Sequence, residues 1–299
     1  KVLTTAQVAA LTTTQASKIS TDQVVALTTA QVAALETSDL AKLSTDAIVS
    51  LSTAQLHVLS TEQISTMTSA QTAALTSDQV GSLSTPQLAA LLAGTQMSTM
   101  TTAQVASLTT SQVVALTTKQ ASELSSTQLA AMSTSQVKAL EVEDLAKIST
   151  AAISALSSAQ AANLTTDQVV ALTTTQAGQL SASALAGFSS AQVAALDTAD
   201  LAKLSTDAIQ AISTSALAGL SAATQVGKLT TAQVVALTTY QVSKLTTAQV
   251  AALSTEQVSK LSSDQLAAMT TAQVTAIEVA DLAVLTTSAL SAITTTDRK

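Results

Sequence analysis

The sequence predicts an all-α repeat solenoid, a superhelix of about 36 very short capped helices with one helix in each eight-residue unit. Three observations predict this fold class: an octad repeat, a helix-capping pattern in its polar columns, and charges distributed according to helix polarity. Arrays of such short units form solenoids because each unit buries its apolar face only against its neighbours. We therefore expect one continuous solenoid over residues 1–299.

The repeat is Leu-Thr-Thr-x-Gln-Val-x-Ala, counted from the large apolar residue at position one. Octads begin at Leu3, and nine-residue units occur at 91–99 and 220–228, which gives 36 units in all. The extra residue near Gly94 predicts a local bulge or kink between stacked helices. The pattern is cut off at both ends, so we expect a fragment of a longer array. Position one is otherwise Leu or Ile, with Met67, Met100, Met132, Met269 and Phe188 as substitutes.

Two simpler folds do not fit the octad. In one continuous helix with 3.6 residues per turn, the apolar stripe would rotate by about 80° in each unit, and no partner could cover it. Strands fit poorly because the apolar positions one and six have opposite parity, without an alternation of period two. One short helix per unit remains.

The polar columns predict how each helix begins. Thr or Ser at position two is an N-cap residue, and Gln at position five of 26 units is the third helical residue. This spacing is a capping box, in which each side chain bonds the backbone N–H of the other residue. Positions one and six then fall where a hydrophobic staple packs, as in Leu3 and Val8.

The charged residues support this helix register. Of the 19 acidic residues, 18 occupy positions two, four or five, and Glu123 is the exception. Seven of the 11 Lys residues occupy the last position of a unit. Acids near a helix start and bases near its end complement the helix dipole. Helices of six or seven residues are unstable alone, so stacking has to stabilise them, with the number of units per turn left open.

Composition argues against several classes of function. The chain has 1% aromatic and 10% charged residues, no Cys, and a net charge of -7 with Arg298 as its one Arg. Nucleic-acid binding needs clustered Lys and Arg, so we expect none. Polar residues interrupt every apolar stretch before the roughly 18 residues of a membrane span. No nucleophile, base and oxyanion donors form a catalytic set, so we expect neither an enzyme nor a cofactor.

Four units contain a pair of acids in place of the Thr and Gln. We interpret these pairs as ordinary anionic caps and expect no metal site, with Ca²⁺ binding as the alternative because that ion prefers oxygen ligands. The pairs are Glu36 with Asp39, Glu141 with Asp144, Asp197 with Asp200, and Glu278 with Asp281.

Four single residues also have ordinary interpretations. His57 falls at the outward position seven, without a second His or a Cys to share a metal. Tyr240 is expected on the surface and Phe188 in the core. Asn163 begins an Asn-Leu-Thr triplet that matches the glycosylation sequon, a match that a Thr-rich chain produces by chance. None of these residues predicts a site.

The LTTAQVAA arrays resemble the low-complexity repeats of very large bacterial surface and secreted proteins, of the kind labelled as adhesins or haem-utilisation proteins. The Leu-Thr-x-x-Gln core is also similar to the LTxxQ motif of Spy-like periplasmic chaperones and to the opening of TAL-effector repeats. Helix-start chemistry explains these two local likenesses. The first resemblance covers all 36 units and implies a protein at the bacterial cell surface or outside the cell.

The leading functional hypothesis is an extracellular structural protein, such as a filament or sheath subunit or an adhesin stalk, that associates with itself. The first alternative is ice or mineral-surface binding by a ladder of Thr and Ser. The second is a scaffold that binds peptides or other partners along an apolar groove.

Overall fold

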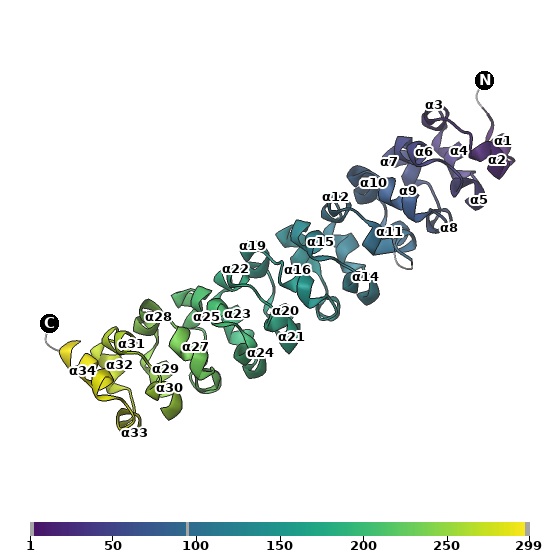
Figure 1. Ribbon diagram of the computed structural model, residues 1–299. Coiled ribbons are helices and arrows are strands. Elements are labelled where there is room, and N and C mark those ends of the chain that lie inside the picture. Colours follow the sequence, from purple (N-terminus) through teal and green to yellow (C-terminus); the bar gives the residue numbers. More distant parts are fainter. Residues whose placement is uncertain (1–2, 94–95, 297–299) are drawn as a thin grey trace. The chain divides into compact units, whose positions relative to one another are not determined.

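A computed structural model describes residues 3–93 and 96–296, and its secondary structure is helical throughout. In these residues there are 34 α-helices and two 3₁₀ helices, η1 and η2, and no strand (Figure 1). This matches one helix per predicted unit and confirms the all-α class. The chain forms two compact units, residues 1–149 and 150–299, and each is described by itself.

The helices are very short in both compact units. In residues 1–149 they are α1 Thr5–Ala9, α2 Thr13–Ala16, α3 Thr21–Val25, α4 Thr29–Ala33, α5 Thr37–Leu40, α6 Thr45–Ser50, α7 Thr53–His57, α8 Thr61–Ser65, α9 Ser69–Ala74, α10 Ser77–Ser82, α11 Thr85–Leu91, η1 Gln96–Thr99, α12 Thr102–Ala106, α13 Thr110–Val114, α14 Thr118–Ser122, α15 Ser126–Ala131, α16 Thr134–Ala139 and α17 Val142–Leu145. In residues 150–299 they are α18 Thr150–Ile153, α19 Ser158–Ala162, α20 Thr166–Ala171, α21 Thr174–Ala177, α22 Ala182–Ala186, α23 Ser190–Ala195, α24 Thr198–Lys203, α25 Thr206–Ala211, α26 Thr214–Leu217, η2 Val226–Lys228, α27 Thr231–Ala236, α28 Thr239–Lys244, α29 Thr247–Ala251, α30 Thr255–Ser259, α31 Ser263–Ala267, α32 Thr271–Thr275, α33 Val279–Leu282 and α34 Thr287–Thr296.

The predicted capping box starts every α-helix whose third residue is Gln. In α10, the N–H of Gln79 donates to the Thr76 hydroxyl at 3.1 Å, and the N–H of Thr76 donates to Gln79 Oε1 at 2.8 Å. Pro86 lies in the first turn of α11, where its missing N–H breaks no helical bond.

The helices stack in layers of three. Within each compact unit, every helix packs against the helix three units further along the chain, as α1 does on α4 and α4 on α7. Position one and position six of each repeat face the interior. Leu51 and Leu56, for example, are 3% and 0% exposed, while the Thr residues at position three lie outside.

The two nine-residue units accommodate their extra residue differently. At 220–228 it lies between cap and glutamine, so the N–H of Ser221 donates to Gln225 Oε1 four positions away, at 2.8 Å. Near 91–99 it lengthens α11 to Leu91. The new unit then begins at Leu92 in hydrogen-bond register, one residue after the sequence boundary at 91. The bulge expected at Gly94 lies outside the described residues.

Candidate functional site

The position-five glutamine makes hydrogen bonds in two directions, as Gln79 of α10 shows. Its Oε1 accepts from the N–H of Thr76 and completes the capping box. Its Nε2 donates to the carbonyls of Leu51 at 2.8 Å, Ile48 at 3.1 Å and Val49 at 3.1 Å. These carbonyls lie at the end of α6, where the last C=O groups of a helix lack helical partners. One side chain therefore caps the start of its own helix and the end of an earlier one.

The same bridge recurs through the described residues, and we call the set of bridging glutamines the amide ladder. Nε2 donates to the position-one carbonyl 28 residues earlier in regular octads, and often to the position-six carbonyl 31 residues earlier. Each ladder glutamine is at most 5% exposed. They are Gln31, Gln55, Gln63, Gln71, Gln79, Gln87, Gln104, Gln112, Gln120, Gln128 and Gln136 in the first compact unit and Gln192, Gln225, Gln233, Gln241, Gln249, Gln257, Gln265 and Gln273 in the second.

The ladder follows the count of units rather than the count of residues. Where the span includes the extra residue near 91–99, Gln104 donates to Leu75, 29 residues earlier, at 2.6 Å. Across 220–228, Gln241 donates to Ile212, also 29 residues earlier, at 2.8 Å. Each bond still joins a unit to the third unit before it. The ladder thus defines three units per turn, which the sequence left open.

Only the oxygen of this glutamine was assigned a role from the sequence. A signal for the second role was present, because Glu serves in a capping box as well as Gln does. Position five nevertheless contains Gln, Asp or Ala and never Glu. A Glu carboxylate cannot donate to a carbonyl, so the exclusion of Glu indicates a requirement for the amide nitrogen.

Aspartates replace the ladder glutamine in the four acidic units. Asp39, Asp144, Asp200 and Asp281 are between 1% and 4% exposed. One carboxylate oxygen of each of the first three is buried and has no hydrogen-bond partner. An ionised carboxylate only accepts hydrogen bonds, so these side chains cannot bridge to the carbonyls of the layer below.

Burial raises the pKa of three of these carboxyl groups. For Asp39, desolvation is the main cause and the nearby Glu36 adds to it. For Asp144, desolvation raises the pKa, a hydrogen bond from Thr118 opposes the shift, and Glu141 and Glu143 add to it. The pKa of Asp200 is raised by desolvation and by Asp197, against a hydrogen bond from Thr174. Removal from water disfavours the charged form of each group.

The anionic-cap interpretation holds for one acidic pair and is wrong for three. Asp197 accepts from the N–H of Asp200 at 2.7 Å. Glu36, Glu141 and Glu278 make no side-chain cap bond, since the extra methylene of Glu makes it a poor N-cap residue.

The four pairs do not gather further acids around them. Among residues 3–93 and 96–296, no group of three or more His, Cys, Asp or Glu side chains is placed to hold a metal ion. Ca²⁺ binding at the pairs stays a prediction that calorimetric titration with CaCl₂ can test. Those residues also contain no helix long and apolar enough to cross a membrane.

Alanine replaces the glutamine in six further units. The positions are Ala47, Ala152, Ala184, Ala208, Ala216 and Ala289. The consecutive helices α24, α25 and α26 carry Asp200, Ala208 and Ala216, so no position-five amide joins this layer to α21–α23. We call α24–α26 the unbridged layer. A Cβ atom at Gly219, which follows α26, would lie 2.2 Å from the Ser190 carbonyl oxygen, so the backbones approach closely there.

The remaining single residues lie where the sequence predicts. His57 is exposed at the end of α7, Tyr240 is 63% exposed, and Phe188 is 3% exposed. The Lys244 ammonium nitrogen lies 5.4 Å from the centre of the Tyr240 ring. Asn163 is exposed, and its side-chain amide donates to the Ala159 carbonyl at 2.8 Å.

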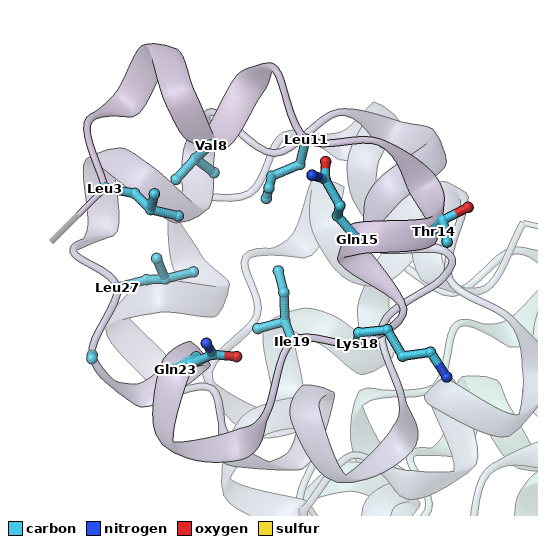
Figure 2. A pocket seen from close by; sticks show the side chains of 10 residues that line it. Leu3, Val8, Leu11, Thr14, Gln15, Lys18, Ile19, Gln23 and Leu27 are labelled. Atoms are coloured by element: carbon cyan, nitrogen blue, oxygen red, sulfur yellow. The ribbon is translucent and has the colours of Figure 1, made fainter. Parts of the chain in front are cut away.

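The first layer of helices, α1–α3, leaves the interior open. Figure 2 shows the side chains of Leu3, Val8, Leu11, Ile19 and Leu27 around a hollow of about 550 Å³. The position-five glutamines of these three helices form capping boxes but lie exposed, unlike the ladder glutamines. They are Gln7, Gln15 and Gln23. The hollow is therefore one unfilled stacking face of the solenoid.

Stacked short helices joined at a fixed interval define a repeat solenoid protein. A family model described as the ALTTAQ repeat matches residues 2–37, 32–69, 137–174, 193–231 and 242–277, more than half of the chain. The chain belongs to the ALTTAQ repeat family. Every matched segment exceeds the 31 residues between a ladder glutamine and its position-six carbonyl, so each is long enough to contain a complete bridge. No curated protein matches the sequence.

Proposed function

We propose that this chain is a structural protein of the bacterial cell surface or extracellular space. It forms part of a filament, sheath or adhesin stalk, performs no catalysis, and associates with itself rather than with nucleic acid. The observation that carries the proposal is the amide ladder. The polar side chain that recurs most regularly lies buried and joins one layer to the next, where it is withdrawn from solvent and from ligands.

Two features of the sequence support an exposed structural role. The octads resemble those of very large bacterial surface and secreted proteins. Only 12 Lys and Arg residues and no Cys occur in 299 residues, which limits both trypsin-like cleavage and thiol oxidation. A protein that supplies length and durability benefits from both properties.

Small-angle X-ray scattering of the 299-residue chain tests this proposal. A compact globular protein of this length has a radius of gyration of about 19 Å. A spacer or stalk should give a value well above that, with the elongated distance distribution of a stack. A radius near 19 Å would contradict the structural role.

The other two hypotheses gain less support. In capping-box units the position-two hydroxyl accepts from a backbone N–H, as Thr76 does, which engages half of the Thr and Ser ladder in the fold. Ice binding would then depend on position three, and a thermal-hysteresis assay measures it. Partner binding along a groove would require grouped apolar side chains, and binding of a hydrophobic dye to the folded chain measures their exposure.

A further inference from the structure

The open face of α1–α3 carries hydrogen-bond donors that the fold does not use elsewhere on its surface in this arrangement. Gln15 and Gln23 lie at the hollow, with apolar side chains between them (Figure 2). In every later layer that carries ladder glutamines, the equivalent amides donate to position-one carbonyls of the layer before. The first layer therefore presents a donor face that is specific for the carbonyl end of another layer.

The last layer, α32–α34, offers the matching acceptors. Its three units begin at Met269, Ile277 and Leu285, and the chain contains no unit three positions further on to supply their glutamines. Apolar residues are also uncovered there. Leu290 at position six is 45% exposed, whereas the same position is 0% exposed at Leu266 of α31.

The charges on the two faces are also complementary. Continuing the three-unit register places α2 over the unit of α33. Lys18, at position eight, lines the hollow on one face, and Glu278 with Asp281 lie in the unit of α33 on the other. In the fold, position eight lies over position three of the unit below, as Gly219 does over Ser190. The same register sets Lys18 over Val279, next to Glu278.

We propose that the α1–α3 face docks onto the α32–α34 face of a second copy of this chain and continues the amide ladder between molecules. Gln7, Gln15 and Gln23 donate to the carbonyls of Met269, Ile277 and Leu285 in the second copy. The contact joins two different faces, so it does not close on itself and yields open chains of molecules. This inference rests on the proposed structural function, for which it names the partner.

Sedimentation velocity of the 299-residue chain over a wide concentration range tests the docking. The mass should rise with concentration without stopping at the dimer. The double variant Gln15→Glu with Gln23→Glu keeps its capping oxygens but loses its amide donors, so it should fold and associate at least about tenfold more weakly. A wild-type chain that stays monomeric, or a double variant that associates like the wild type, overturns the inference.

A matched control separates docking from a general effect of charge. Gln179→Glu with Gln210→Glu adds the same charge at two exposed positions away from either face. It should associate as the wild type does. Equal weakening by both double variants would overturn the docking register. An elongated monomer in the scattering experiment would leave the structural function standing while removing this inference, so the two failures are distinguishable.

Engineered cysteines test the register itself, since the chain has no Cys of its own. Under oxidising conditions, the double variant Lys18→Cys with Val279→Cys should give a ladder of disulfide-linked oligomers. Each single variant should give at most dimers. The absence of products beyond the dimer from the double variant would contradict the proposed register.

Discussion

Two neighbouring parts of residues 150–299 stack in the same order but are joined in different ways. Helices α27–α32 carry six ladder glutamines in succession, from Gln233 to Gln273, and each donates to the layers before it. The unbridged layer, α24–α26, donates none. Both parts bury positions one and six equally well. The apolar core therefore sets the order of stacking, and the amides add a separate contribution that a layer can lack.

The largest effect is expected from breaking the ladder where it is complete. Gln241→Ala removes the cap bond to Thr238 and leaves the carbonyls of Ile209, Gln210 and Ile212 without this donor. Buried groups that lose their partners cost about 1 to 3 kcal/mol each, so we expect the free energy of unfolding to fall by about 2 to 4 kcal/mol. Urea titration followed by circular dichroism measures it.

The control for this change is Gln210→Ala, at an exposed side chain one layer earlier. Surface substitutions of this kind usually change stability by less than about 0.5 kcal/mol. Similar losses for Gln241→Ala and Gln210→Ala would mean that the buried amide contributes little.

The unbridged layer should be more sensitive to an added methyl group at its closest backbone contact. In Gly219→Ala, the new Cβ would lie 2.2 Å from the Ser190 carbonyl oxygen, so one backbone has to move. Overpacking typically costs about 1 to 3 kcal/mol, measured by the same titration. Gly178→Ala is the matched variant, since its Cβ would keep 3.3 Å from Lys203. A loss as large at Gly178 would rule out close backbone approach as the cause.

The acid in the unbridged layer should make its stability depend on pH. The pKa of Asp200 is raised above the ordinary value of 3.8, chiefly by burial. The folded state therefore binds this proton more tightly than the unfolded state does. The resulting stabilisation is complete below about pH 3.8 and is lost as pH rises through the folded-state pKa.

Asp200→Asn is neutral at every pH and should remove this contribution. The free energy of unfolding of the variant, relative to the wild type, should increase from pH 4 to pH 7 in urea titrations. Asp207→Asn, at an exposed position in α25, should show a smaller increase. A relative stability of Asp200→Asn that stays constant between these pH values would contradict burial of the charged group.

The smallest effect is expected from adding a missing bridge. In Ala208→Gln, the new amide is in register with the carbonyl of Leu180, three units before. One additional hydrogen bond contributes about 0.5 to 1.5 kcal/mol, so thermal unfolding should shift upward slightly. Ala216→Gln should not stabilise the fold in the same way, because Gly219 already brings that helix close to Ser190. Stabilisation by both variants would indicate that the two positions have equal space.

The local rules of the fold could be predicted from the sequence, because caps are short-range. Thr76 and Gln79 are three residues apart, and their spacing alone specifies the capping box. The bridge from Gln79 to Leu51 spans 28 residues, and no pattern within one octad fixes that interval. The uniform glutamine column conceals it, since any multiple of eight aligns equally well. The failed cap at Glu36 depends on side-chain length, which a charge pattern does not register.

The role of the acidic units could be predicted only in part, for a related reason. Sequence places Asp39 and Asp200 in the first turn of a helix, where acids are favourable. It does not show that the layer below covers position five. Burial of these carboxyl groups follows from the three-unit turn, so their raised pKa could be derived only after the stacking was known.

Hydrogen exchange of the glutamine side-chain amides, followed by NMR on a chain labelled with ¹⁵N-glutamine, tests the central claim most directly. Monomer concentrations should be used, so that the open face is free. The amide ladder predicts two classes: slow exchange for the ladder glutamines such as Gln79 and Gln241, and fast exchange for Gln7, Gln15 and Gln23. Uniformly fast exchange in the folded chain would contradict the account, because it would place the amides in solvent rather than between the layers.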